Sequence, residues 1–194
     1  MKKILLLLAI AGIFAACNKG ENKDNDQTAK NKASMQKFAD EVINKHNPAM
    51  VDSLCTSDFV EHTPDPMQKD KGREGLKKSM AEFIAAYPDI SVKTNFMVAD
   101  SNTVVSHFTM TGTNTGSMMG MPATGKKMTV DGVDIVKFKD GKGIEHWGYM
   151  EEMKWMQQMG MMPDMNEMMN MKDTSKKKMD MKDMKMDKKD MKAK

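Results

Sequence analysis

The chain has 194 residues, of which 40% are hydrophobic and 29% are charged, enough for one globular domain with additional terminal segments. Its formal net charge of +3 is unevenly spread, because residues 172–194 hold ten lysines against five aspartates, while residues 17–171 carry a net charge of −4. A mildly acidic domain excludes nucleic-acid binding through a basic surface, so we expect no nucleic-acid partner.

Residues 1–16 have the pattern of a secretory signal peptide, with two lysines, an apolar run too short to span a membrane comfortably, and small residues before Cys17. The last four positions, Phe14-Ala15-Ala16-Cys17, resemble the lipobox of bacterial lipoproteins, whose cysteine becomes the acylated first residue of the mature chain. An ordinary cleaved signal with an incidental cysteine is the alternative. Acylation would hold the protein on a membrane of the bacterial cell envelope, at its periplasmic or surface face, without spanning it.

Residues 17–32 are polar and lack periodicity, which predicts a flexible tether. Beyond them, apolar residues recur at three- and four-residue steps in segments bounded by prolines. We predict three helices, at residues 33–46, 48–54 and 72–86. Phe59 and Val60 lie in a short extended piece between the second and third helices.

After residue 88 the apolar residues alternate with period two, which is typical of half-buried strands. We predict four strands, at residues 90–98, 103–113, 128–138 and 142–149. Asp140-Gly141 is a hairpin turn signal, and the helical period returns from Glu151. Three helices, a four-stranded meander and a final helix predict an α+β fold, with helices packed on one side of a curved antiparallel sheet.

Three stretches of the predicted domain, residues 33–162, resemble one known family. They are Glu61-His62-Thr63-Pro64, the glycine-rich residues 111–126, and residues 141–160 with their aromatic strand. Together they resemble the SnoaL-like polyketide cyclase or ester cyclase branch of the NTF2-like superfamily. The resemblance implies a cone of bent sheet and helices, a pocket for a small, largely apolar molecule, and a homodimer through the outer face of the sheet.

The resemblance also implies catalytic residues. In that family an aspartate four residues after a tryptophan is the acid/base of an intramolecular aldol closure, and the matching residue after Trp147 is Glu151. Glu151 is therefore the expected base, pointing into the fold, with His62 or His107 polarising the substrate. The alternative is that Glu151 and the glutamate after it only favour the positive end of the following helix. The glutamate at this position, and Asn114 where the family often has histidine, both depart from the family pattern.

His107 shares its predicted strand face with two threonines, forming a polar stripe that is typical of a ligand pocket. A structural histidine that is simply hydrogen-bonded is the alternative. We predict the following substrate-binding residues: Phe59, Thr109, Thr111, Trp147 and Tyr149.

No pair of histidines has metal-ligand spacing, and the sequence has neither a P-loop nor a dinucleotide-binding glycine motif, so we expect no metal or cofactor in the domain. Residues 163–194 form a low-complexity tail of methionine, lysine and aspartate. Clustered thioethers suit Cu(I). The alternatives are a solvated, irregular tail and a tail whose excess lysines are attracted to anionic lipid. Three hypotheses follow: a cyclase, isomerase or hydrolase; a non-catalytic ligand-binding lipoprotein; and copper binding by the tail.

Overall fold

The computed structural model describes residues 18–118 and 120–163, with side chains placed from Asn25 onward. The predicted signal peptide, the predicted acylation site Cys17 and the methionine-rich tail after residue 163 lie outside the described residues. The chain divides into two units, residues 1–151 and 152–194, which are described separately. Among the described helices, none combines the length and the apolar character that crossing a bilayer requires.

The first unit is built on one five-stranded sheet with the strand order β1-β5-β4-β3-β2. Four of its strands form the predicted antiparallel meander: β2 (Ser91–Asp100), β3 (Thr103–Thr113), β4 (Lys127–Lys139) and β5 (Lys142–Met150). The fifth strand, β1 (Cys55–Glu61), pairs with β5 in parallel, so the sheet is mixed. No local sequence pattern reveals this pairing, because its two strands lie far apart in the chain.

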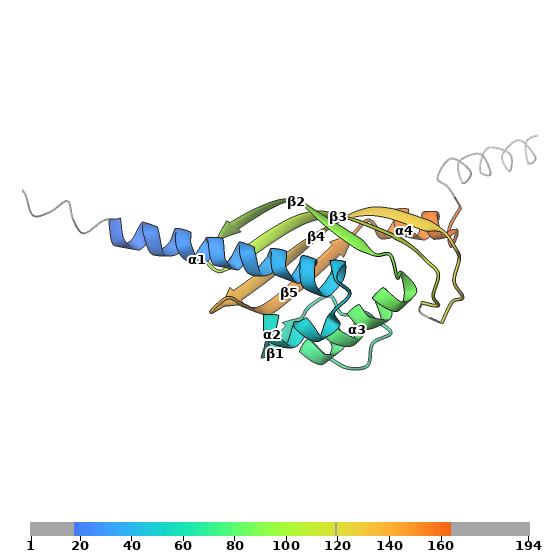
Figure 1. The fold of residues 1–194 in the computed structure, drawn as a ribbon, viewed down its shortest axis with the longest axis horizontal. Coiled ribbons are helices and arrows are strands. Elements are labelled where there is room, and N and C mark those ends of the chain that lie inside the picture. The colour runs from blue at the N-terminus through green and yellow to red at the C-terminus, as the bar shows by residue number, and fades with distance from the viewer. Residues whose placement is uncertain (1–17, 119, 164–194) are drawn as a thin grey trace, which may run out of the picture. The chain divides into compact units, whose positions relative to one another are not determined.

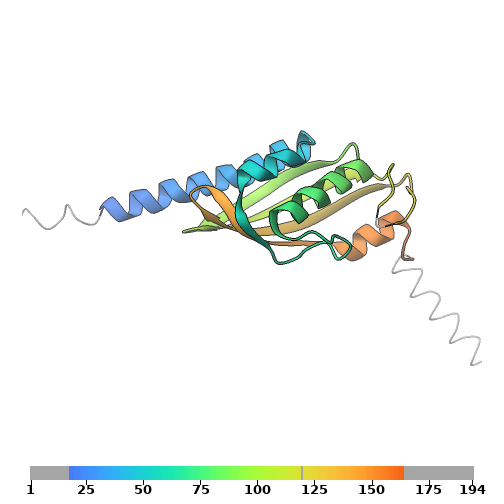
Figure 2. The same cartoon turned by 90° about the horizontal axis from the view of Figure 1, so that it is seen from below.

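All the helices of the first unit lie on one face of this sheet (Figures 1 and 2). They are α1 (Asn18–Lys37), the π-helical segment η1 (Phe38–Asn44), the 3₁₀ turn η2 (Pro48–Met50), α2 (Val51–Leu54) and α3 (Gly72–Ala86). The predicted α+β class is confirmed, with helices packed on one side of a curved sheet.

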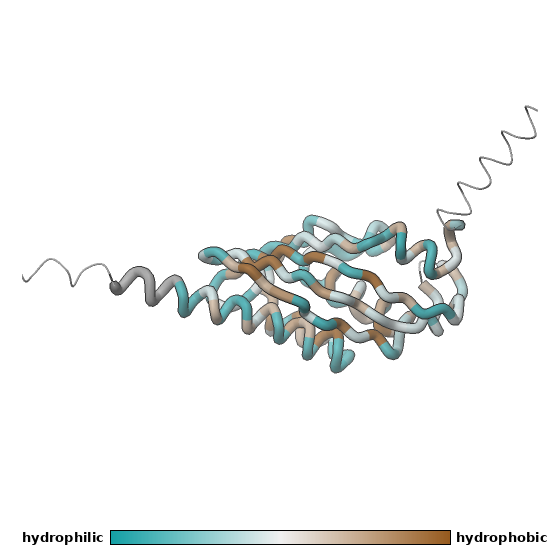
Figure 3. Tube along the Cα trace, turned by 90° about the horizontal axis from the view of Figure 1, so that it is seen from above, coloured by the Kyte–Doolittle hydropathy of each residue, from teal (hydrophilic) through white to brown (hydrophobic). Residues whose placement is uncertain are grey.

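Helix α1 corrects the predicted tether, because residues 18–32 are helical. Residues 25–32 are mostly hydrophilic (Figure 3), but Asn31 is only 1% exposed, and its side-chain amide donates to the backbone oxygen of Ser101. One turn further on, Met35 packs in a buried cluster with Val104 and Phe138. The helix is thus stabilised by packing against the sheet. Such tertiary contacts cannot be predicted from the composition of the segment itself.

Strand β2 departs from the predicted alternation. The register with β3 shifts between Thr94 and Phe96, so Asn95 is an extra residue in a β-bulge. Thr94 before the bulge faces the helices, whereas Phe96 and Val98 after it are 57% and 56% exposed on the opposite face. A single inserted residue therefore reverses the facing of every later residue in the strand.

The remaining boundaries agree with the sequence. Asp140 and Gly141 both adopt positive φ, 51° and 76°, as expected for a two-residue hairpin turn between β4 and β5. In the second unit, helix α4 (Glu152–Met159) begins where the apolar period changes from two to helical spacing.

Candidate functional site

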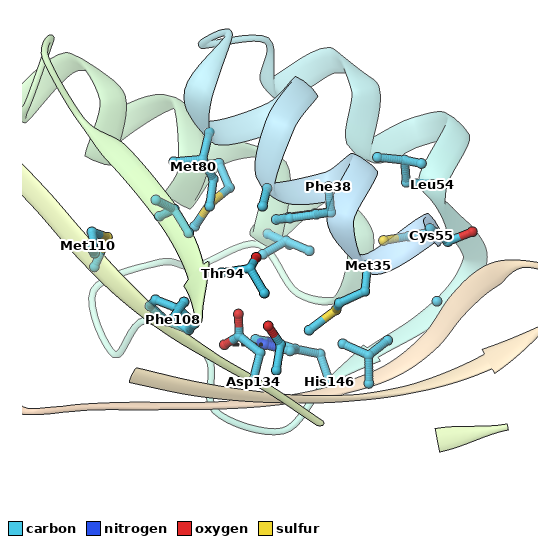
Figure 4. Close-up of a pocket in the computed structure, with 18 of the residues that line it drawn as sticks. Met35, Phe38, Leu54, Cys55, Met80, Thr94, Phe108, Met110, Asp134 and His146 are labelled. Carbon is cyan, nitrogen blue, oxygen red and sulfur yellow. Dashed lines mark hydrogen bonds and ion pairs between the residues drawn. The ribbon is translucent and has the colours of Figure 1, made fainter. Parts of the chain in front are cut away.

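A cavity of about 250 Å³ lies between the helices and the inner face of the sheet. Its walls are mainly apolar, with Met35, Phe38 and Met80 from the helices and Phe108 and Met110 from β3 (Figure 4). Room for the Phe108 ring comes from the neighbouring strand, where a Cβ on Gly132 would overlap that ring. The sheet and the helices thus leave a hollow that fits a small apolar molecule.

One acidic and one basic side chain, Asp134 of β4 and His146 of β5, interrupt this apolar lining (Figure 4). His146 Nε2 lies 3.2 Å from Asp134 Oδ1, and His146 Nδ1 lies 2.6 Å from Oε2 of Glu61 at the end of β1. Gly148 of β5 is the register partner of Asp134, and it leaves space for the Asp134 carboxylate and the His146 ring. A Cβ at this position would lie 3.0 Å from the imidazole and 3.1 Å from Asp134. The three side chains form a carboxylate–imidazole–carboxylate row, which we call the histidine triad.

The histidine triad fixes the protonation of His146. Ionised carboxylates only accept hydrogen bonds, so both ring nitrogens must donate and the ring is an imidazolium. Burial alone would lower the pKa of His146, but the hydrogen bonds and charges of Asp134 and Glu61 outweigh it and raise that pKa to about 10. His146 is therefore a fixed cation at neutral pH rather than a base.

Glu61 is held from behind by a second layer of hydrogen bonds. Its Oε1 accepts from the backbone nitrogen and the hydroxyl of Thr63, at 3.0 and 3.1 Å, and the Thr63 hydroxyl accepts from the backbone nitrogen of Gly148 at 2.7 Å. Burial acts to raise the pKa of Glu61, but the hydrogen bond and charge of His146, with the Thr63 donors, bring it below its usual range. Glu61 thus stays ionised and orients the imidazolium.

Two hydroxyl groups lie on the same wall as Asp134. Ser106 of β3 is the register partner of Asp134, and Thr94 of β2 is the last residue before the bulge to face the cavity. Cys55 also lines the cavity, and burial raises the pKa of its thiol to about 12, so it is uncharged. The cavity therefore combines one carboxylate, one imidazolium and three hydroxyls with an apolar interior. The third hydroxyl, that of Ser34 on α1, donates to the backbone oxygen of Gly141 at 2.8 Å.

Of the predicted site residues, Phe59 lines the cavity and is 5% exposed. Glu151 does not line it: its side chain is exposed, and its Oε2 accepts a hydrogen bond of 3.0 Å from the backbone nitrogen of Asp131. The prediction that Glu151 points into the fold is wrong. Strand β5 ends at Met150, and the residues of that strand that line the cavity are Gly143, His146 and Met150.

The predicted polar stripe of β3 faces away from the cavity. His107, Thr109 and Thr111 alternate with the buried residues of β3, and three of those buried residues line the cavity: Ser106, Phe108 and Met110. Asn95 donates to Thr109 Oγ1 at 2.9 Å and lies 3.1 Å from His107 Nδ1. His107 also stacks on Phe96, with ring centroids 5.1 Å apart. These contacts form a hydrogen-bonded patch on the outer face of the sheet.

His62, Trp147 and Tyr149 likewise lie outside the cavity lining. The rings of His62 and Trp147 stack with centroids 4.2 Å apart, and His62 Nε2 lies 2.9 Å from Glu145 Oε2. Tyr149 is 57% exposed. Asn114, where the resembling family often has histidine, is buried and accepts two hydrogen bonds from Thr124, so it fixes the loop before β4.

Asp134 was not among the predicted site residues, although the sequence contains a signal for it. It shares its strand parity with Met128, Val130, Val136 and Phe138, all of them buried, so it is a single carboxylate on an otherwise apolar face. Such a group requires a partner or a function. His146 lies on the cavity-facing side of β5, as Asp134 does on β4. Its partner Glu61, however, comes from β1, whose parallel pairing with β5 was not predicted.

No metal site accompanies the triad. Within residues 18–118 and 120–163, no group of three or more His, Cys, Asp or Glu side chains is arranged to hold a metal ion. His146 itself has no lone pair to offer, because both ring nitrogens face carboxylates.

The sequence and the fold were compared with those of known proteins. The sequence profile described as SnoaL-like polyketide cyclase matches residues 33–159. TsrD from Streptomyces laurentii is 24% identical with a TM-score of 0.62, over 69% of this chain and 97% of that chain. AclR from Streptomyces galilaeus is 22% identical with a TM-score of 0.64, over 80% of this chain and 96% of that one. IdmH from Streptomyces antibioticus is 21% identical with a TM-score of 0.59, over 67% and 98%. At these identities the likeness to solved structures shows the fold alone. No curated protein matches the chain.

Proposed function

Because the chain belongs to the SnoaL-like polyketide cyclase family, we propose that its cavity binds a small, largely apolar carbonyl compound and that Asp134 removes a proton from the carbon next to the carbonyl. The observation that carries this proposal is a carboxylate facing an apolar cavity, held in place by a permanently charged imidazolium. Proton abstraction of this kind is the first step of both isomerisation and aldol cyclisation.

Each polar group has a role in the proposed step. Asp134 takes the proton from carbon, and the electron pair of the broken C–H bond moves onto the carbonyl oxygen as an enolate. The hydroxyls of Thr94 and Ser106 are the donors that would stabilise this oxygen. His146 keeps the proton on both nitrogens and positions Asp134 rather than reacting, and Glu61 holds His146.

The exchange of carbon-bound hydrogen in D₂O tests this step without knowledge of the natural substrate. We expect the protein to accelerate deuterium incorporation next to the carbonyl of 2-tetralone, a small bicyclic ketone, as followed by proton NMR. Asp134→Asn should reduce the rate by about 10²-fold or more, the contribution usual for a general base. Asp131→Asn is the matched control, because Asp131 lies on the same strand outside the cavity lining and should leave the rate unchanged. Equal rates for Asp134→Asn and the unaltered protein would refute the assignment of the base.

Binding without turnover is the second candidate function. It is favoured by the two hydrogen bonds that hold the imidazolium on carboxylates at both nitrogens, an arrangement that also suits a static recognition site. Native mass spectrometry of the purified protein distinguishes the two candidates: a ligand that co-purifies and is released chemically unchanged, with no deuterium exchange, supports binding alone.

The envelope location remains part of this proposal. The lipobox-like residues 14–17 support acylation at Cys17, which would present the cavity at a membrane surface. Growth with an alkynyl fatty acid followed by click labelling should tag the protein, and Cys17→Ala should abolish the label. Labelling that persists in Cys17→Ala would contradict acylation at this residue.

A further inference from the structure

The charge on the wall of the cavity comes from very few groups. Among the residues that line the cavity, the ionisable ones are Asp134, His146 and Cys55, and the Cys55 thiol is uncharged. None of the lining residues is lysine or arginine. Any charge that a ligand meets is therefore set by Asp134 and His146, together with Glu61 behind them.

The positive charge of His146 is already committed. Its two N–H groups point at Glu61 and Asp134, 2.6 and 3.2 Å away, so one imidazolium lies between two carboxylates and the triad carries a net charge of −1. No N–H group of the ring remains for a ligand. The carboxylate that lines the cavity is Asp134, whereas Glu61 is not part of the lining.

From this arrangement, and resting on the proposed ligand-binding cavity, we propose that the cavity selects its ligand by charge: it accepts apolar molecules whose polar group is neutral or cationic and rejects free carboxylates. A ligand carboxylate would lose its hydration in an apolar cavity, would find no free cation, and would lie close to the negative charge of Asp134. A ketone or an ester meets none of these costs. An ammonium group also loses hydration, but the net negative charge of the triad attracts it and offsets that loss. The substrate class is thus the ester or ketone form of an apolar compound and not the corresponding acid.

The size of the cavity limits this class further. Its volume of about 250 Å³ is slightly below the range of about 300–1,000 Å³ usual for drug-sized ligands. A compact molecule of one or two rings is therefore a suitable probe, and three naphthalene derivatives differ in little but charge: methyl 2-naphthoate, 2-naphthoate and 2-naphthylmethylammonium.

Isothermal titration calorimetry of the purified protein with these three probes at neutral pH tests the proposal. We expect the ester and the ammonium probe to bind and the carboxylate to bind at least tenfold more weakly. In Asp134→Asn, which removes the charge and nearly keeps the shape, the ratio of ester affinity to carboxylate affinity should fall by at least tenfold. Asp131→Asn is the control and should leave that ratio unchanged, since Asp131 does not line the cavity.

Each outcome bears on a different claim. Equal affinity of the unaltered protein for ester and carboxylate overturns charge selection but leaves ligand binding intact. Discrimination that survives in Asp134→Asn overturns the role of Asp134. If none of the three probes binds, the ligand-binding function fails and this inference fails with it. If Asp134→Asn does not fold, the three-probe series on the unaltered protein still decides whether charge selection occurs.

Discussion

Glu61 and His146 are direct register partners in the parallel pair of β1 and β5, and their side chains meet at 2.6 Å although the residues lie 85 positions apart in the chain. This pairing turns a histidine that also faces Asp134 into a fixed cation. The chemistry of the cavity therefore depends on a strand pair that joins two distant parts of the sequence.

The raised pKa of His146 predicts a pH-dependent stability. Its value of about 10 in the folded protein exceeds the ordinary 6.5, so this group's stabilisation is fully present below pH 6.5 and is lost as the pH rises through about 10. Glu61, whose pKa is lowered, loses its contribution as the pH falls below its ordinary value of 4.5.

Urea unfolding of the unaltered protein and of His146→Gln measures this effect. The difference between their free energies of unfolding should be large near pH 6 and should shrink steadily toward pH 10. Because the other ionisable groups are present in both proteins, their contributions cancel in this difference. A difference independent of pH, or an NMR titration of His146 with its midpoint near 6.5, would show that the ring is not held as an imidazolium.

Gly132 should resist substitution because it gives space to a cavity residue. A Cβ at this position would overlap the Phe108 ring, so Gly132→Ala should destabilise the protein by roughly 1–3 kcal/mol, as overpacking usually does. Gly143→Ala is the matched control on β5, since its Cβ would approach no atom closer than 3.4 Å. Comparable unfolding free energies for both variants would contradict the packing described for Phe108.

Cys55 should be inert in the folded protein. It is 4% exposed, and burial raises the pKa of its thiol to about 12, so almost no thiolate is present at pH 8. In a Cys17→Ser background, which leaves Cys55 as the single thiol of the chain, a dithiobis(nitrobenzoate) assay should detect no rapid reaction until urea is added. Rapid stoichiometric labelling without urea would mean that the lining near Cys55 opens readily.

The outer face of the sheet is the expected dimer interface. It exposes Phe96, Val98 and Tyr149, each of them more than half accessible in the first unit. We expect light scattering to give twice the mass of the chain, and the double variant Phe96→Asp, Val98→Asp to give a monomer. Met67→Asp, at a residue that is 64% exposed and outside the strands, should remain dimeric. A monomeric unaltered protein at all concentrations would exclude this interface.

The sequence predicted the elements well because their periodicities are local. Helix α3 and strand β3 have the bounds expected from the pattern, and the meander from β2 to β5 follows from alternation and turn residues. Two tertiary features were not predicted from the sequence: the packing of α1 against the sheet through Asn31, and the parallel pairing of β1 with β5. Neither has a signal within a window of a few residues.

The site was harder to predict than the fold, because strand parity alone does not say which face is covered. On β3 the polar residues His107 and Thr109 were expected to line a pocket, but the helices cover the apolar face. The cavity is lined by the apolar sets of β3 and β4, and its functional groups are the exceptions within those sets, Ser106 and Asp134. A polar residue inside an apolar alternation was the better indicator.

The position of the acting carboxylate is the central claim, and a direct comparison of Asp134→Asn with Glu151→Gln tests it. Both substitutions remove one negative charge with little change of shape, one inside the cavity and one on an exposed side chain. The measurement is the rate of deuterium exchange into 2-tetralone at equal protein concentration. We predict that Asp134→Asn loses about 10²-fold or more while Glu151→Gln keeps the full rate. Loss of the rate in Glu151→Gln, with Asp134→Asn unaffected, would contradict the assignment of the functional site to the cavity.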